Sequence, residues 1–154
     1  SHDAAEPVAY VLDDGTVRVG ICTDTGVVTP LLAERFKACD VLLLEANHDA
    51  DMLRHGPYPW SLKQRIASRL GHLANHQAQE ALHRLVTPKL RGVVAMHLSE
   101  TNNLPGLAQE CFSGVVNGTI PIGVAGRHHM LRLSLDAASL HMERLEAPPT
   151  RRRR

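Results

Sequence analysis

Two histidines and one aspartate stand where predicted strands begin or end, and their side chains could bind a metal ion. His2 lies in the segment Ser-His-Asp-Ala, Asp24 in Cys-Thr-Asp-Thr-Gly, and His97 in Met-His-Leu-Ser. Imidazole and carboxylate groups suit borderline divalent cations such as zinc or manganese. The compact H-x-H-x-D-H cluster that would complete a two-metal site does not occur in the sequence. The sequence therefore predicts part of the metal site of a hydrolase.

Asp24 and His97 also have structural interpretations. Asp24 follows an apolar run and precedes Gly26, so a turn or helix-cap aspartate would explain it as well. A single histidine at the end of a strand, such as His97, is commonly structural. The loop at residues 98–103 is rich in hydroxyl and amide side chains, which are suited to orienting a ligand or accepting a phosphate.

Three further residues are candidates for catalysis. Glu45 ends a continuous apolar run, which would place its carboxylate near the edge of a sheet. His48 follows closely and could support the metal ligands or contact a substrate. The alternative is a set of capping residues for the next helix, a role that Asn47 or Asp49 alone would satisfy. His72 lies between two predicted helices, where it could protonate a leaving oxygen near neutral pH. The alternative for His72 is an ordinary surface histidine.

The elements that must position these residues alternate between strands and helices. Asp13-Asp14-Gly15 is typical of a hairpin turn, and Thr29-Pro30 is typical of a helix start. Strands are expected at residues 7–12, 16–22, 41–44, 93–96, 120–124, 130–135 and 140–145. Helices are expected at residues 30–38, 49–54, 61–70, 76–85 (capped by Asn75) and 104–116. This order predicts an α/β fold in which helices cover one face of a mixed sheet.

Composition narrows the function classes. The 154 residues suffice for one domain, and the formal charge of +1 argues against a strongly basic nucleic-acid module. Residues 1–150 hold 13 basic and 16 acidic residues, a formal −3, because four arginines close the chain. Aromatic residues make up only 3%, which is few for a base-stacking platform. The three scattered cysteines favour reduced thiols and a cytoplasmic protein, and the sequence predicts no membrane span.

Several segments together resemble a known family. Their order is S-H-D-A-x-x-P-V-x-Y, T-D-T-G, L-E-A-N-H-D-x-x-M-L-x-x-G-x-Y-P, L-K-x-R-I, G-H-L-A-N-x-Q-A and H-L-S-x-x-N-N-x-P. This pattern is similar to the metallo-β-lactamase fold superfamily, in particular its WalJ/YycJ-like branch of metal-dependent hydrolases. The resemblance covers roughly residues 1–125, and residues 44–75 carry most of its specificity.

The resemblance implies an αββα sandwich with two metal ions, zinc or manganese, at one edge. By the family pattern His2 and His97 are metal ligands and Asp24 bridges both ions. His72 resembles a histidine that assists departure of the leaving group, and Glu45 and His48 fall in the neighbouring motif. The activity implied is two-metal hydrolysis of phosphodiesters by a 5′-to-3′ exonuclease acting on DNA.

The resemblance also suggests what the sequence lacks. We expect residues 1–146 to be the C-terminal portion of such a domain, half of the sandwich, and inactive or weak without the N-terminal half. An unpartnered sheet would expose an apolar face and favour self-association. The alternatives are a non-catalytic domain that binds a partner or nucleic acid, and a site completed in trans by a second chain. Residues 147–154 are expected to form a solvated, disordered Pro/Arg-rich tail.

Overall fold

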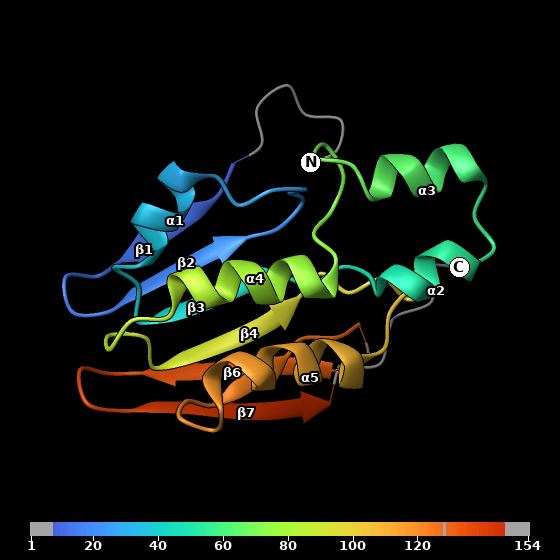
Figure 1. Ribbon diagram of the computed structural model, residues 1–154. Helices are drawn as coiled ribbons and strands as arrows, with labels where there is room; N and C mark the ends of the chain where they lie inside the picture. Colours follow the sequence, from blue (N-terminus) through green and yellow to red (C-terminus); the bar gives the residue numbers. More distant parts are fainter. Residues whose placement is uncertain (1–7, 128, 147–154) are drawn as a thin grey trace, which may run out of the picture.

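The computed structural model describes residues 8–127 and 129–146, which form one mixed sheet, a set of helices and a separate hairpin (Figure 1). The sheet has the order β1-β2-β3-β4-β5, in which β1 is antiparallel to β2 and all other neighbours are parallel. The strands are β1 (Tyr10–Asp13), β2 (Arg18–Cys22), β3 (Val41–Glu45), β4 (Gly92–Met96), β5 (Ile122–Val124), β6 (His129–Leu135) and β7 (Leu140–Glu146). The helices are α1 (Pro30–Phe36), α2 (Ala50–His55), α3 (Trp60–Ile66), α4 (Asn75–Leu85) and α5 (Pro105–Val116). The predicted α/β class and element order are confirmed.

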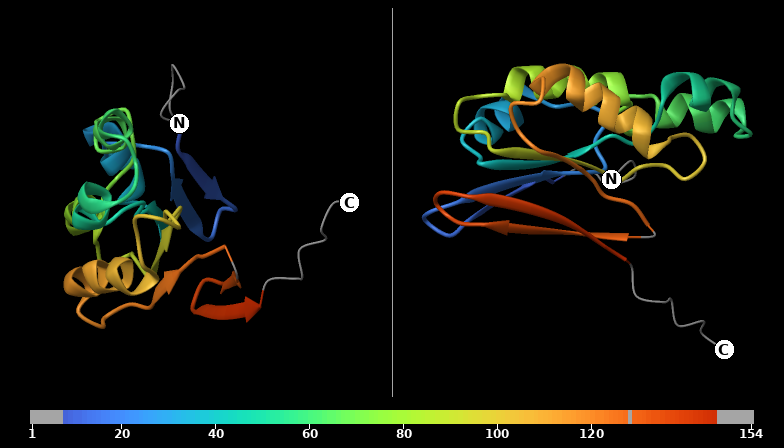
Figure 2. Two further views of the ribbon diagram at one scale, coloured as in Figure 1. Left: turned by 90° about the vertical axis from the view of Figure 1, so that its right-hand side faces the viewer. Right: turned by 90° about the horizontal axis from the view of Figure 1, so that it is seen from below.

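Helices cover one face of this sheet, as predicted (Figure 2). Leu42 and Leu44 of β3 point to that face and are fully buried with Phe36 of α1, Leu82 of α4 and Phe112 of α5. Burying one such side chain contributes roughly 1.5–3 kcal/mol, so this layer is the main source of stability. No helix among the described residues is both long enough and apolar enough to span a membrane.

The β6–β7 hairpin lies against the opposite face of the sheet (Figure 2). It packs where β4 and β5 carry glycine: a Cβ atom at Gly92 would collide with Leu140 and Met142, and one at Gly123 would collide with Leu131. The late strands were predicted, but their position in a second layer was not. The hairpin therefore covers part of the apolar face that an unpartnered sheet would leave open.

The remainder of that face is apolar and accessible. Tyr10 and Leu12 of β1 pair with Ile21 and Val19 of β2, so the four side chains share one face. Tyr10 and Leu12 are 59% and 58% exposed. Self-association through this face stays a prediction.

Two predicted helix ends differ from the structure. Helix α3 ends at Ile66, not at residue 70, because the chain turns through bonds from Gly71 N to Ser68 O and from His72 N to Ile66 O. Asn75 does not cap α4; Ala74 occupies that position, and its N–H donates to the Gln77 side chain. The predicted cap of α2 by Asp49 is confirmed, since its carboxylate accepts bonds from two N–H groups of the first turn.

Candidate metal centre

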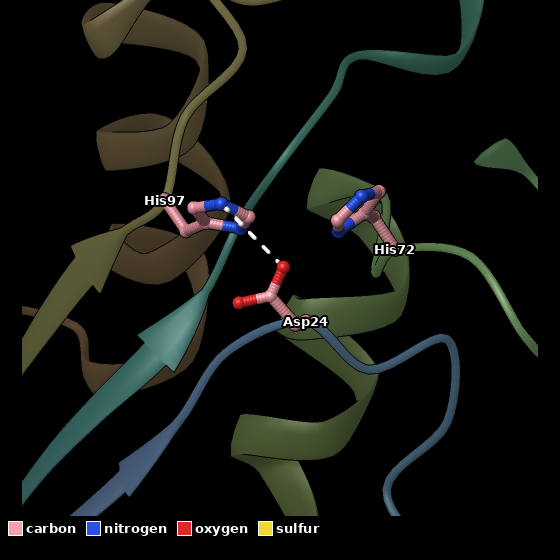
Figure 3. Close-up of side chains that lie close together, drawn as sticks. All are labelled: Asp24, His72 and His97. Carbon is pink, nitrogen blue, oxygen red and sulfur yellow. Dashed lines mark ion pairs between the residues drawn. The ribbon is translucent and has the colours of Figure 1, made fainter. Parts of the chain in front are cut away.

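Three parallel strands bring the candidate residues to one edge of the sheet. Cys22 of β2 lies beside Leu44 of β3, and Leu44 lies beside Ala95 of β4. Parallel strands in register end together, so the residues that follow them meet at the carboxyl edge, where α/β proteins bind ligands. Asp24 and His97 lie just beyond β2 and β4, and Glu45 is the last residue of β3. The α3–α4 loop adds His72 (Figure 3).

Glu45 connects these segments. Its side chain is fully buried, and one oxygen, Oε1, accepts bonds from His72 Nδ1 at 2.6 Å and His97 Nδ1 at 2.8 Å. The other oxygen, Oε2, accepts from the Thr25 N–H at 2.8 Å. A carboxylate that accepts from the Nδ1–H of a histidine fixes its tautomer and orients Nε2 toward a metal or substrate. Both rings are therefore held by Glu45 on their Nδ1 side, and the Nε2 atom of His97 lies toward Asp24.

The side chains of Asp24, His72 and His97 converge (Figure 3). Each offers one potential ligand atom, and these atoms lie within 4.8 Å of one another. His97 Nε2 is 3.8 Å from Asp24 Oδ1, and the two imidazole rings are 5.2 Å apart between centroids. The Asp24 carboxylate and the His97 imidazole are donors that fit zinc or manganese, and His72 lies close enough to act on a group bound beside them.

The backbone at this centre is unusual. Asp24 and His97 have φ values of 56° and 59°, in the left-handed region that non-glycine residues seldom adopt. Such conformations cost of order 1–3 kcal/mol each and persist only where surrounding contacts impose them. Near Asp24, Gly26 lies so close to the backbone of Ser68 and Arg69 that a Cβ atom would collide with it. The fold thus holds two candidate ligands in strained conformations.

Charge within the centre follows from this hydrogen bonding. Burial raises the pKa of Glu45, but bonds from His72, His97 and Thr25 outweigh it, so the pKa lies below its ordinary value. The bond to Glu45 raises the pKa of His97 against the opposing effect of burial. Glu45 is therefore an anion in the folded protein, and it attracts positive charge to the centre.

The structure does not bring every predicted site residue into this group. His2 lies outside the described residues, so its role as a ligand stays a prediction. His48 is buried, its carbonyl accepts the Asn75 N–H at 2.8 Å, and its side chain lines a separate cavity with Trp60 and Lys63. His48 is not among the residues that converge with Asp24, and its catalytic role stays a prediction.

His48 should make the protein sensitive to acid. Burial, reinforced by His72, lowers its pKa to about 4 from an ordinary 6.5, so the unfolded chain takes up a proton between these pH values and the folded chain does not. The free energy of unfolding should therefore fall as pH falls from 6.5 to 4, by a contribution on the order of 3 kcal/mol. Replacing His48 with Gln should flatten this decline in urea unfolding measured across that range. The exposed variant His83→Gln is the control, and an equal decline in both variants would contradict the assignment.

A network of buried amides, which the sequence analysis missed, supports the site. Asn103 Nδ2 donates to the carbonyls of Ala46 and Asn47 and to Asn75 Oδ1, while Asn47 Nδ2 donates to the His97 carbonyl at 2.9 Å. Asn103 belongs to the loop that was expected to orient a ligand, but its side chain is buried and joins the segment after β3 to the start of α4, while Asn47 provides the link to the residue after β4. The wide separation of the partners in sequence explains why no local pattern indicated this network.

A cavity of about 460 Å³ opens beside the centre. His72 and His97 line it together with Tyr58, Arg65 and Ser99. An arginine and hydroxyl groups next to a metal-binding group suit a phosphate ester. The cavity gives a substrate direct access to both histidines.

Comparison with known proteins decides the family. A model of the beta-lactamase superfamily domain matches residues 1–98, which is more than half of the chain. The chain belongs to the metallo-β-lactamase superfamily. This metallo-β-lactamase chain is similar to the protein named exodeoxyribonuclease YycJ of Bacillus anthracis, with 39% identity over 116 residues, 75% of this chain and 44% of the relative. Exodeoxyribonuclease WalJ of Streptococcus pneumoniae is 42% identical over 108 residues, 70% of this chain and 40% of the relative.

The predicted WalJ/YycJ branch of the metallo-β-lactamase superfamily is thereby confirmed. The metallo-β-lactamase fold is supported separately by the crystal structure of YhfI from Bacillus subtilis, with a TM-score of 0.54 at 17% identity. That likeness covers 76% of this chain and 40% of YhfI. The chain spans less than half the length of the curated relatives it matches.

Proposed function

We propose that this chain contributes to the active site of a metal-dependent exonuclease that hydrolyses DNA phosphodiesters from the 5′ end. The names of its relatives, which are called exodeoxyribonucleases, support this class of activity. The observation that carries the proposal is the shared hydrogen bonding of His72 and His97 to one buried carboxylate, Glu45. A protein stabilised only by packing has no need of an ionised group at this position.

Asp24 and His97 are the proposed metal ligands in the described chain, with His2 as a third. Zinc and manganese both accept this combination of imidazole and carboxylate. A bound divalent ion would supply Lewis acidity to the phosphoryl group and lower the pKa of water. Glu45 keeps His97 in the tautomer that presents Nε2 to the ion.

His72 is the proposed general acid. Its Nδ1 is bound to Glu45, so its Nε2 is the atom that can carry a proton toward the leaving oxygen. The ring also borders the cavity of about 460 Å³, where a substrate phosphate would meet it.

The remaining ligands of a two-metal site are proposed to come from a segment outside this sequence, which spans 40–44% of its exodeoxyribonuclease relatives. A cytoplasmic setting is part of the proposal, because Cys22, Cys39 and Cys111 are all free thiols.

An exonuclease assay tests this function. The chain is incubated with manganese and a 5′-phosphorylated single-stranded oligonucleotide, alone and with a family segment that contains H-x-H-x-D-H. We expect release of mononucleotides, and His72→Ala should lower kcat by about 10²–10⁴-fold while metal affinity is retained. The exposed variant Arg84→Ala is the matched control. Full turnover by His72→Ala, or no release in either mixture, would contradict the proposal.

A further inference from the structure

The segment between Asp51 and Glu80 differs in charge from the rest of the chain. It contains no acidic residue, whereas residues 1–150 as a whole carry an excess of acidic groups. Its basic residues other than histidine are Arg54, Lys63, Arg65 and Arg69. This concentration of positive charge includes helix α3 and the turn that follows it. It creates a local attraction for polyanions that the net charge of the chain conceals.

Helix α3 contributes almost nothing to the core. None of its residues is buried, and it projects beyond the edge of the sheet (Figure 1). Trp60, the single tryptophan of the chain, begins the helix and is 68% exposed. An exposed indole gives up the stabilisation that burial would provide, so this position favours a function outside the core. The chain has few aromatic residues, and its largest one lies within the basic segment.

Two cavities flank α3, and one of them reaches the metal centre. On one side, Arg65, Tyr58 and Leu62 line the cavity of about 460 Å³ that contains His72 and His97. On the other side, Trp60, Lys63 and Arg54 line a cavity of about 350 Å³. A chain of phosphates lying across α3 would therefore meet cationic groups on both sides, and one end would reach the histidines.

We propose that α3 is the platform on which a single strand of DNA lies, with one base stacked on Trp60 and phosphates bound by Lys63 and Arg65. Stacking on an exposed aromatic ring requires an unpaired base, whose face is free, so the surface selects single strands over duplex. Lys63 Nζ already donates to the Arg54 carbonyl at 2.8 Å, and an ammonium group has further N–H donors for a phosphate. The inference rests on the proposed function and adds to it the path by which the strand reaches the site.

The emission of Trp60 gives a direct test, because no other tryptophan contributes. The chain is titrated with oligothymidylate in EDTA, so that binding is measured without metal. We expect saturable quenching of the emission, weakened by salt, with much less quenching by duplex of the same length. For variants, affinity is measured by the anisotropy of a labelled oligonucleotide.

Variants separate the two kinds of contact. Trp60→Ala should weaken binding by roughly tenfold or more, and Trp60→Phe should restore part of the loss. Lys63→Ala with Arg65→Ala should weaken binding and make the slope of log affinity against log salt concentration shallower by about 1.4. Arg84→Ala on α4 is the matched control and should bind as the wild type does. Unfolding curves identify any variant that fails to fold.

The outcomes distinguish this inference from the proposed function. Binding without quenching, equal quenching by duplex, or unchanged affinity in the Trp60 and Lys63/Arg65 variants would overturn the platform. The platform on α3 should not depend on the metal centre. The Trp60 emission of Asp24→Asn should therefore be quenched by oligothymidylate in EDTA as in the wild type. Metal-dependent cleavage that is indifferent to the α3 variants would overturn the platform and leave the proposed function standing.

Discussion

Replacing Asp24 with Asn is expected to abolish measurable zinc and manganese binding while the fold is retained. The amide keeps the size of the side chain but loses the negative charge that attracts the ion. Asn also tolerates a φ of 56°, so the change does not strain the backbone further. The loss of affinity should exceed the 10- to 100-fold that follows removal of a group supporting a ligand. Isothermal titration with each metal measures the effect.

The matched control for Asp24→Asn is Asp51→Asn, which changes an exposed aspartate of helix α2. It should bind metal as the wild type does. Full metal affinity in Asp24→Asn, together with a normal thermal transition, would exclude Asp24 as a ligand.

Glu45→Gln is expected to have the second large effect, on both stability and metal affinity. The carboxylate accepts three N–H bonds, from His72, His97 and Thr25, whereas a glutamine amide must turn an NH₂ group toward some of these donors. Leaving a buried donor without an acceptor costs about 1–3 kcal/mol. Metal affinity should fall about 10- to 100-fold because His97 is no longer oriented.

The pH dependence of stability checks the same variant. The pKa of Glu45 is lowered from 4.5, so its ionised form stabilises the folded chain above that pH, and this stability is lost as pH falls through the folded-state pKa. The pKa of His97 is raised from 6.5, so its contribution is present below that pH and is lost as pH rises through the folded-state pKa. In Glu45→Gln, the free energy of unfolding measured by chemical denaturation should depend less on pH, both at the acidic end and above neutral pH. The exposed variant Glu80→Gln should keep both dependences, and identical pH profiles for the two variants would contradict the role of Glu45.

Much of the site's position could be predicted from the sequence because it depends on local patterns. Continuous apolar runs before Glu45 and His97 identified buried parallel strands, and such strands end at a common edge. Asp24, Glu45 and His97 stand at or just after the ends of such runs, so the sequence was enough to predict that they lie close together. Thr29-Pro30 likewise identified the start of α1, since a hydroxyl cap and a proline at the first turn act locally.

The connections between these elements could not be predicted. Glu45 and its two histidine partners are separated by 27 and 52 residues, and no spacing rule indicates that one oxygen serves both. Asn75 has the chemistry of a helix cap, yet tertiary bonding to Asn103 uses its side chain instead. The packing of β6–β7 against Gly92 and Gly123 depends on close approach between distant segments, which alternating hydrophobicity does not specify.

Cobalt(II) NMR of the chain tests the metal centre most directly. Cobalt replaces zinc in such donor sets, and its unpaired electrons shift the signals of nearby protons. The Nδ1–H of His97 is bound to Glu45, so it should give a strongly shifted, exchangeable signal when cobalt binds. We expect this signal in the wild type and in His72→Ala, and its loss in Asp24→Asn and His97→Ala. A wild type that shows no shifted imidazole signal at saturating cobalt, or a signal that persists in His97→Ala, would contradict a metal ion held by Asp24 and His97.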